Sequence, residues 1–261
     1  MDVLELASCL ILLYFLFNTF YISFFSLIGA FSKNKATIEN PYKNTFLILF
    51  PSYKNDQIIL NGLEQFEKIK YPKNQFDVYI IGDYLQNSTY EIFAQKGINF
   101  IRLEQVKSTK TKAIQEALKQ INIDKYDYII INDIDNIMEP NFLNEINKTC
   151  ITNPDIVQGH RIAKNTNNEY AILDAISEEI NNTIFRKAHV KIGLSSALIG
   201  SGFATKASLF KDTINSCEAV GGFDKELEVK FLSNNHHILY AHNAFIFDEK
   251  TDNPQNFEKQ R

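Results

Sequence analysis

The sequence is poor in the residues that fibrous and disordered chains need. Glycine (10) and proline (6) are scarce among the 261 residues, whereas 21 Phe and 12 Tyr supply many large aromatic side chains. These numbers exclude a collagen-like or intrinsically disordered chain. With 45% hydrophobic residues, the length is enough for one ordinary α/β domain and too short for two full domains.

Positive charge is not in excess either. Lys and Arg number 27 and Asp and Glu 31, so the net charge is −4. A chain without a broad cationic face lacks the electrostatic footprint of a protein that binds duplex nucleic acid, and we expect no nucleic-acid partner. Cysteine is rare as well: Cys9, Cys150 and Cys217 are an odd number without metal spacing. This pattern is typical of buried thiols in a reducing compartment.

One long apolar segment stands near the N-terminus. Residues 7–31 carry no charge, and about 20 apolar residues suffice to cross a bilayer. A signal peptide would begin with basic residues, but Asp2 and Glu5 precede this segment. Lys33 and Lys35 follow it, so the positive-inside rule predicts that the rest of the chain is cytoplasmic. We therefore predict a single N-terminal transmembrane anchor.

After the anchor, short β-rich apolar runs alternate with longer amphipathic stretches. This alternation predicts βαβ units, that is, an α/β fold with a mostly parallel sheet flanked by helices. The predicted strands are residues 45–50, 77–81, 99–103 and 126–131, and the predicted helices are 56–68, 88–95 and 111–120. No linker or repeat interrupts the pattern. We predict an anchor at residues 1–33 and one catalytic domain at residues 44–261.

An aspartate pair follows the most apolar predicted strand. Asp133 and Asp135 flank one residue just after that strand ends at Ile131. Carboxylates at this spacing on an extended segment point to the same side, so both can bind one hard cation whose other positions nucleotide phosphates fill. An Asx-turn leading to a helix near Asn141 is the alternative. The spacing alone leaves both interpretations open.

Taken together, several segments resemble the family 2 glycosyltransferases with a GT-A (Rossmann-like) fold. The likeness is greatest to the membrane-anchored bacterial group of cellulose and hyaluronan synthases, and it runs from about residue 45 to 261. The similar segments are residues 47–56, 79–83, 107–118 and 133–140, and the last is the closest match. The resemblance implies a nucleotide site made by Pro51, Tyr53, Asp83, Lys112 and Asp133. It also implies that Asp133 and Asp135 hold Mg²⁺ or Mn²⁺.

Two later segments resemble the acceptor side of the same family. Gly200, Ser201 and Gly202 are similar to a small-residue loop beside the acceptor sugar, where glycines let the backbone approach a ligand. An ordinary turn before a helix at residues 206–210 is the alternative. Gln260 matches the first residue of the Q-x-x-R-W motif of processive relatives. The rest of that motif is absent from this sequence, so we expect a domain truncated within it.

The family's general base is the aspartate of a Thr-Glu-Asp triplet, and this sequence departs from it. Residues 224–229 are the matching run, and they align Glu226 with the base; Asp224 takes that position after a local shift. Glutamate can remove a proton as aspartate does, but its extra methylene moves the carboxylate. A solvated acidic helix start is the alternative for these carboxylates. His242 is either a third metal ligand or a partly buried structural histidine.

The resemblance implies an inverting glycosyltransferase in the bacterial inner membrane with a cytoplasmic catalytic domain. It would move a sugar from a nucleotide-diphosphate donor, a UDP-sugar, to the hydroxyl of a glycan or lipid-linked acceptor. A catalytically silent membrane subunit that binds a nucleotide-sugar or a partner synthase is the main alternative. A nucleotidyltransferase is a third, but residues 50–54 are not the glycine-rich basic loop that it would need.

Overall fold

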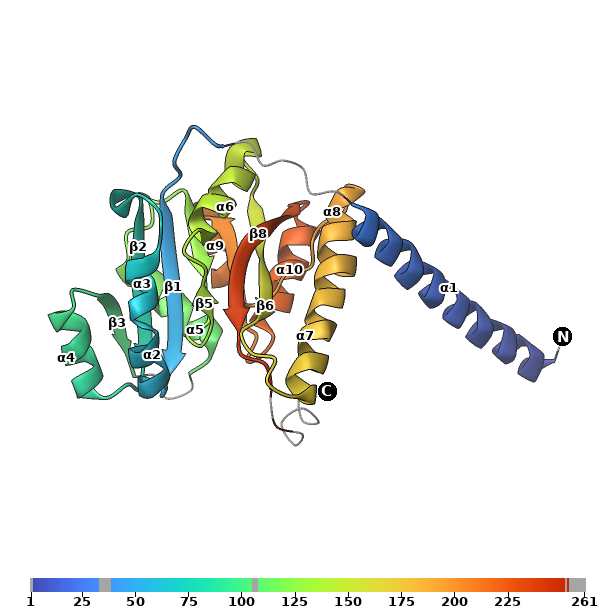
Figure 1. Ribbon diagram of the computed structural model, residues 1–261, viewed down its shortest axis with the longest axis horizontal. Coiled ribbons are helices and arrows are strands. Elements are labelled where there is room, and N and C mark those ends of the chain that lie inside the picture. The colour runs from blue at the N-terminus through green and yellow to red at the C-terminus, as the bar shows by residue number, and fades with distance from the viewer. Residues whose placement is uncertain (1, 33–38, 105–107, 252, 254–261) are drawn as a thin grey trace.

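The computed structural model describes residues 2–32, 39–104, 108–251 and 253. They form an α/β domain from which one long helix, α1 (Val3–Phe31), extends to the side (Figure 1). Within these residues the strands make one eight-stranded sheet in the order β3-β2-β1-β4-β7-β6-β8-β5. The predicted α/β architecture is confirmed.

The first half of the sheet, which we call the parallel half, follows the predicted βαβ alternation. Its strands are β1 (Phe46–Tyr53), β2 (Phe76–Asp83), β3 (Asn99–Leu103) and β4 (Tyr128–Ile131), and they pair with one another in parallel. Its helices are α2 (Asp56–Gly62), α3 (Glu64–Lys68), the 3-10 turn η1 (Lys73–Gln75), α4 (Asn87–Gln95) and α5 (Lys110–Gln120). The elements agree with the predicted ones to within a few residues at their ends.

The second half, the mixed half, contains β5 (Ile137–Met138), β6 (Ile156–Ala163), β7 (Phe203–Lys206) and β8 (Ile238–Asp248). Strand β7 is antiparallel to both β4 and β6, and β8 is parallel to β6. Two reversals cancel, so the carboxyl ends of β6 and β8 lie at the same edge as those of β1 and β4. The helical elements here are α6 (Phe142–Thr149), η2 (Cys150–Thr152), α7 (Glu169–Asn181), the π-helix η3 (Asn182–Ala188), α8 (His189–Lys191), α9 (Ala207–Asn215) and α10 (Phe223–Ser233).

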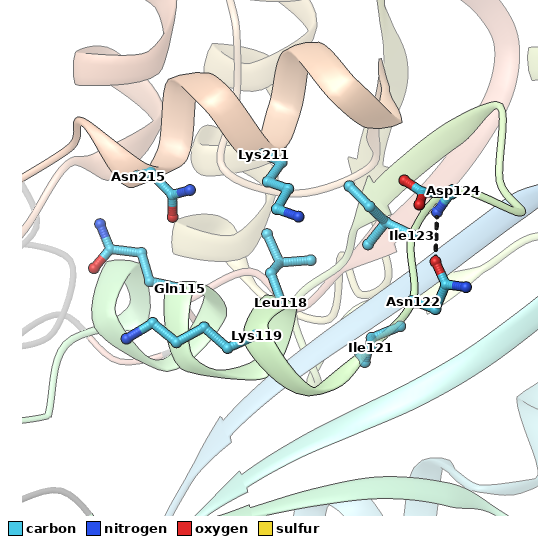
Figure 2. Close-up of a pocket in the computed structure, with 9 residues that line it drawn as sticks. All are labelled: Gln115, Leu118, Lys119, Ile121, Asn122, Ile123, Asp124, Lys211 and Asn215. Atoms are coloured by element: carbon cyan, nitrogen blue, oxygen red, sulfur yellow. Dashed lines mark hydrogen bonds between the residues drawn. The ribbon is translucent and has the colours of Figure 1, made fainter.

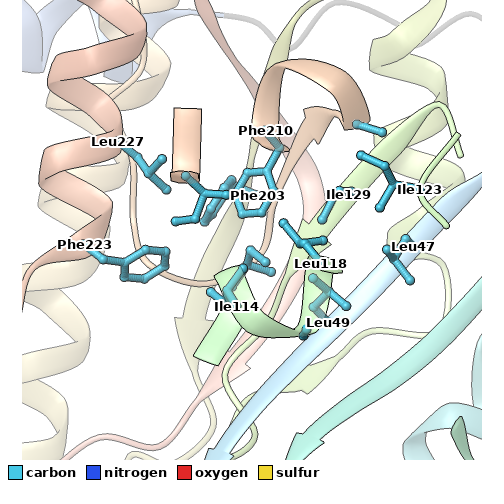
Figure 3. Packing of buried hydrophobic residues seen from close by; sticks show 14 of the residues in the cluster. Leu47, Leu49, Ile114, Leu118, Ile123, Ile129, Phe203, Phe210, Phe223 and Leu227 are labelled. Carbon is cyan, nitrogen blue, oxygen red and sulfur yellow. The ribbon is translucent and has the colours of Figure 1, made fainter. Parts of the chain in front are cut away.

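Strand β1 is apolar on both faces because helices cover both faces of the sheet. Leu47 and Leu49 pack on the side of α5, α9 and α10 (Figure 3). Phe46, Ile48 and Phe50 pack on the other side, with residues of α2, α4 and α6. All five are 0% exposed, and each such burial contributes about 1.5–3 kcal/mol. These two cores fix the strand ends from which the site is built.

Strand β1 does not end at Pro51, as the sequence predicted, but continues to Tyr53. Proline has no backbone N–H to donate, so it fits poorly in a strand that has neighbours on both sides. Strand β4 pairs with β1 only as far as Leu49, opposite Ile131, so Pro51 lies where β1 has lost that neighbour. The strand therefore continues with β2 alone, and Tyr53 pairs with Asp83 at its end.

Helix α1 begins with a capping box between Asp2 and Glu5, and most of its apolar side chains are exposed. Its C-terminal part packs on η3, where Phe25 contacts Ile184 and Ala188. By length and composition α1 is able to cross a membrane, and no other helix of the described residues is.

Candidate active site

The turn that carries the aspartate pair is held by a buried serine. Ser201 is 0% exposed, and its hydroxyl accepts hydrogen bonds from the Asp133 backbone N–H (3.0 Å) and from Asn136 Nδ2 (2.8 Å). It donates to Asn132 Oδ1 at 3.1 Å. The segment is a turn closed by Asn136 N–H on the Asp133 carbonyl (3.1 Å), rather than the extended segment that the sequence argument assumed. Ser201 thus fixes the conformation of the turn that carries Asp133.

A lysine that the sequence argument missed lies against Asp133. The Lys110 ammonium forms an ion pair with the Asp133 carboxylate and donates to the Gly200 carbonyl at 2.8 Å. It also lies 4.5 Å from the centroid of the Phe223 ring. Thr109 is the N-cap of α5, and Lys110 is the first residue of that helix. Lys110 therefore links the turn after β4, which carries Asp133, to the loop before β7, which contains Gly200.

The predicted residue Lys112 is exposed, two positions into the same helix, and its backbone N–H bonds the Thr109 hydroxyl at 3.2 Å. The structure records no contact between its ammonium and the aspartate pair. With Thr109 as the N-cap, Lys110 and Lys112 both lie in the first turn of α5, so the cap signal in the sequence does not choose between them.

Asp135 carries a carboxylate whose charge is poorly compensated. The side chain reaches solvent, but the pKa is raised, first by the loss of water around the carboxylate and then by the charges of Asp133 and Asp248. Lys110 lowers it only in part. The pair therefore forms a spot of excess negative charge that a cation would relieve.

The ends of β1 and β2 form a second group at this edge. Tyr53 is 50% exposed and Asp83 is buried. The rings of Tyr53 and Tyr84 meet edge to face at 6.1 Å, and the Lys54 ammonium lies 5.0 Å and 5.4 Å from their centroids. Lys54 (φ 53°) and Tyr84 (φ 56°) both have left-handed backbones, a strain that is often kept at functional sites. The sequence argument missed Tyr84 and Lys54.

The small-residue loop divides into a supporting part and an exposed part. Gly202 (φ +68°) packs so closely that a Cβ would lie 2.6 Å from Ile246 Cγ1, and with Ser201 it supports the Asp133 turn. Gly200 is less buried, and a Cβ there would lie 3.6 Å from the carboxyl carbon of Asp224. Gly200 is thus the member of the loop that borders an acidic side chain. Gln260 lies outside the described residues.

Asp224 and Glu226 have different surroundings in the first turn of α10. Glu226 accepts backbone hydrogen bonds from Glu218 (3.0 Å) and Ala219 (2.8 Å) and lies 3.6 Å from Lys230. Slight burial raises its pKa, but these bonds outweigh it and hold the pKa below its ordinary value. Asp224 lies beside Gly200, and no hydrogen bond or ion pair of its carboxylate is found within the described residues. These contacts do not support Glu226 as the base.

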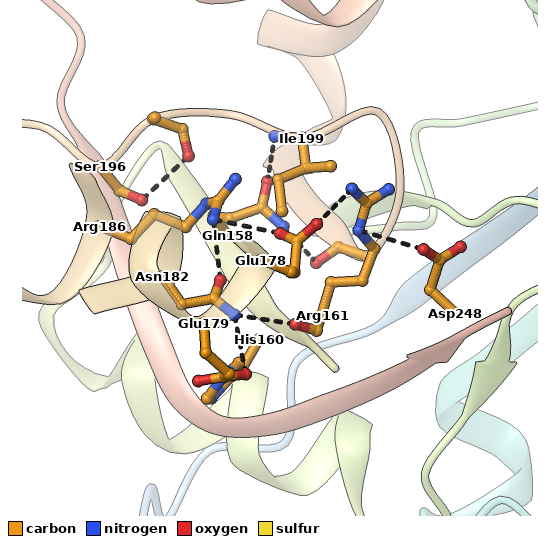
Figure 4. Close-up of polar contacts among 12 residues, drawn as sticks. Gln158, His160, Arg161, Glu178, Glu179, Asn182, Arg186, Ser196, Ile199 and Asp248 are labelled. Atoms are coloured by element: carbon orange, nitrogen blue, oxygen red, sulfur yellow. Dashed lines mark hydrogen bonds and ion pairs between the residues drawn. The ribbon is translucent and has the colours of Figure 1, made fainter. Parts of the chain in front are cut away.

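A charge cluster near the carboxyl ends of β6 and β8 is made of Arg161, Glu178, Arg186, Asp248 and Lys250. Figure 4 shows the first four of these residues. Glu178 pairs with Arg161 at 2.7 Å and with Arg186 at 3.3 Å. Asp248 pairs with Lys250 at 2.8 Å and lies 3.8 Å from Arg161. Burial raises the pKa of Glu178, but Arg161 and Arg186 outweigh it and lower the pKa.

His242 is not part of the aspartate site. Its ring lies 4.8 Å from that of His160, and among the described residues no third His, Cys, Asp or Glu joins Asp133 and Asp135 in a metal-binding group. Burial, His160 and Lys187 lower the pKa of His242 to about 4, against a smaller opposing effect of Glu179. This agrees with a structural histidine.

A separate surface pocket lies between α5, α9 and residues 121–124 (Figure 2). Residues 121–124 lead into the amino end of β4, whereas Asp133 follows its carboxyl end. This pocket is therefore at the opposite edge of the sheet and is not part of the site.

Comparison with known proteins agrees with this geometry. Residues 43–261 match the family described as "Glycosyltransferase like family 2". No curated protein sequence matches the chain. Among solved structures, the mannosyltransferase PcManGT from Pyrobaculum calidifontis, in complex with GDP-Man and Mn²⁺, is similar with a TM-score of 0.67 at 13% identity over 90% of this chain and 68% of that one.

TarS of S. aureus (residues 1–349) is similar with a TM-score of 0.57 at 17% identity, over 78% of this chain and 60% of that one. The chain thus spans less than two thirds of that structure, and at these identities both likenesses show the fold alone. The family model, however, covers most of the chain. The protein therefore belongs to glycosyltransferase family 2 and is a glycosyltransferase with a GT-A fold.

Proposed function

We propose that the protein transfers a sugar from a UDP-sugar to a hydroxyl of a glycan or lipid-linked acceptor, with inversion at the anomeric carbon and with Mg²⁺ or Mn²⁺ as cofactor. The observation that carries the proposal is the convergence of Asp133, Lys110, Gly200 and Asp224 at one edge of the sheet. Similar structures that contain GDP-Man with Mn²⁺, UDP-GlcNAc or UDP support a nucleotide-sugar donor and a divalent cation.

Asp133 and Asp135 fit a divalent cation. They offer oxygen ligands, and the pKa of Asp135 is raised first by loss of water around its carboxylate and then by the charge of Asp133. Because two carboxylates leave most positions of a hard cation open, oxygens of the diphosphate and water can complete the shell. When bound, the cation supplies charge neutralisation for the leaving diphosphate. Lys110 orients the Asp133 carboxylate beside Gly200.

The nucleotide would lie over the ends of β1 and β2. The exposed Tyr53 ring offers a face for stacking on a base. Tyr84 contacts that ring edge to face, and the Lys54 ammonium lies over it. Asp83 ends the neighbouring strand and is the candidate for a ribose or base contact. Pro51 lies two residues before the end of β1, and its contact with the nucleotide remains a prediction from the sequence. Lys112 remains a prediction from the sequence, as an exposed cation near the start of α5.

Asp224 is the better placed general base. Its carboxylate would accept the proton of the acceptor hydroxyl while that oxygen attacks the anomeric carbon. The bond from this carbon to the diphosphate oxygen breaks on the opposite face, and the configuration inverts. Glu226, the residue favoured by the alignment, instead ties residues 218 and 219 to α10. Gly200 would border the acceptor, with Ser201 and Gly202 supporting it, and Gln260 remains a prediction from the sequence.

Helix α1 would anchor the protein in the bacterial inner membrane with the domain on the cytoplasmic side. Its length and apolar composition support the anchor, and Lys33 and Lys35 support the orientation.

Calorimetric titration of the full chain with UDP, with and without Mn²⁺, tests the donor site. We expect binding that needs the metal and that Asp135→Asn weakens. Binding without metal dependence would contradict the clamp. Metal-dependent binding without any sugar transfer or donor hydrolysis would favour a catalytically silent subunit.

A further inference from the structure

Helix α7 has its polarity reversed with respect to an ordinary surface helix. Ile172, Ile176 and Ile180 recur every fourth residue, and with Leu173 they are 43–54% exposed. The inner face instead buries Glu178, which is 8% exposed and paired with Arg161 and Arg186. A helix of a soluble domain turns its apolar stripe inward. The outer face of α7 is therefore made for an apolar surrounding.

The apolar face of α7 continues that of α1. A groove beside the two helices is lined by Ser26 and Ala30 of α1, by Ala175, Ile176, Glu179 and Ile180 of α7, and by Thr183 and Ile184 of η3. From their junction near α8 the two helices diverge (Figure 1). Glu179 is the one charged residue that lines this groove, and its carboxylate pairs with His160 at 3.0 Å.

The segment after α8 extends the same surface. Ile192 and Leu194 are 45% and 48% exposed, and the exposed Lys191 precedes them. This segment is held to α1, because His189 Nε2 and the Tyr21 hydroxyl are 2.6 Å apart. Exposed aliphatic side chains beside a lysine are typical of segments that lie in the headgroup region of an anionic membrane.

We propose that the outer face of α7, with Ile192 and Leu194, lies in the interfacial layer of the lipid bilayer that α1 crosses. The inference rests on the proposed role of α1 as anchor. Helix α7 begins just after β6 ends, at the site edge, and runs from there to the junction with α1 (Figure 1). A membrane on its outer face would hold the active-site edge beside the bilayer, where a lipid-linked acceptor is found.

Depth-dependent fluorescence quenching tests this surface on the full-length chain. The background is Cys9→Ser, since Cys150 and Cys217 are buried. An environment-sensitive dye is attached to one new cysteine at a time: Ile176→Cys on α7, Leu13→Cys on α1 and Val229→Cys on α10. The last two are matched controls, with wild-type exposures of 60% and 63%. The proteins are reconstituted in phosphatidylcholine and phosphatidylglycerol bilayers that carry acyl-chain bromine.

We expect brominated lipid to quench the labels at positions 176 and 13 at least about twofold more than the label at 229, because bromine quenches only groups within the apolar layer. Aqueous iodide should quench the label at 229 alone. Quenching by lipid at 13 but not at 176 overturns the inference and leaves the anchor. No lipid quenching at 13 overturns the anchor and the inference together.

A label at 176 that is shielded from both quenchers, in a protein that cross-links as a dimer through α7, would assign this face to a second copy and overturn the inference. Manganese-dependent UDP binding, measured on the same samples, reports the proposed function independently of these outcomes.

Discussion

The two halves of the sheet build the same edge in different ways. In the parallel half, Asp83 is the last residue of β2 and Asp133 is the second residue after β4, so each functional side chain lies at the carboxyl end of its strand. In the mixed half, Arg161 lies two residues before the end of β6 and Asp248 is the last residue of β8, but they are tied to Glu178 and Lys250. The parallel half thus offers charge to a ligand, whereas the mixed half neutralises its own charge. Changes to the aspartate pair should therefore affect activity, whereas changes to the charge cluster near the ends of β6 and β8 should affect stability. Asp224 of α10 is the residue of the mixed half that we expect to affect activity.

The largest effect is expected in the parallel half. Asp133→Asn and Asp135→Asn should each lower sugar transfer about a thousandfold, because the leaving diphosphate loses its metal clamp. The melting temperature should change little, since removing a carboxylate relieves repulsion at the site. Transfer assays and thermal melts check this, with the exposed Asp212→Asn as control. Full activity in Asp135→Asn would contradict the claim that the parallel half offers its charge to a ligand.

The mixed half should respond in the opposite sense. Glu178→Ala leaves Arg161 and Arg186 buried with less compensation, and removing one partner of a buried pair costs about 3–5 kcal/mol of unfolding free energy. Urea unfolding in detergent measures the change, with the exposed Glu91→Ala as control. A loss below about 1 kcal/mol, the range of surface pairs, would show that the cluster is solvated.

Lys110 joins the two halves, since it contacts Asp133 and the Gly200 carbonyl. Lys110→Ala should lower transfer about thirtyfold, because one charge-assisted contact at the reacting edge is lost. Lys112→Ala, the control from the same helix, should lower it less than about threefold, a range typical of exposed charges. The reverse order of the two effects would restore the role that the sequence argument gave to Lys112.

The smallest effect concerns pH and the mixed half. His242 has a folded pKa of about 4, below its ordinary value of 6.5, so it is neutral in the fold and binds a proton more readily when unfolded. The associated stability is present at neutral pH and falls as the pH drops from about 6.5 to 4, by about 1–2 kcal/mol after allowance for partial exposure. His242→Asn should flatten urea-unfolding stability over that window; an unchanged slope would assign it to other groups.

The parallel half could be predicted from the sequence because its signals are local. Each strand is a short apolar run, each helix has its period, and Asp83 and Asp133 lie at the carboxyl ends of strands. The end of β1 was placed too early, since the strand continues past Pro51 after it has lost β4 as a neighbour. Lys110, Lys54 and Tyr84 were not predicted, because their contacts at the site form only in the fold.

The mixed half depends on long-range contacts that leave no local pattern. Strand β7 is short and enters the sheet antiparallel, between β4 and β6. Alignment favoured Glu226, but only the fold shows that Glu226 bonds residues 218 and 219 whereas Asp224 borders Gly200. The role of Ser201 was likewise hidden, because its partners Asn132 and Asn136 are far away in the sequence.

The choice between Asp224 and Glu226 tests the account most directly. Single-turnover transfer from a saturating UDP-sugar should fall by about a hundredfold or more in Asp224→Asn, with Mn²⁺-dependent UDP binding unchanged, because only the proton acceptor is lost. Glu226→Gln should stay within about threefold of the wild type, as expected for a residue remote from the reacting atoms. Normal transfer by Asp224→Asn together with an inactive Glu226→Gln would contradict the proposed arrangement of the active site.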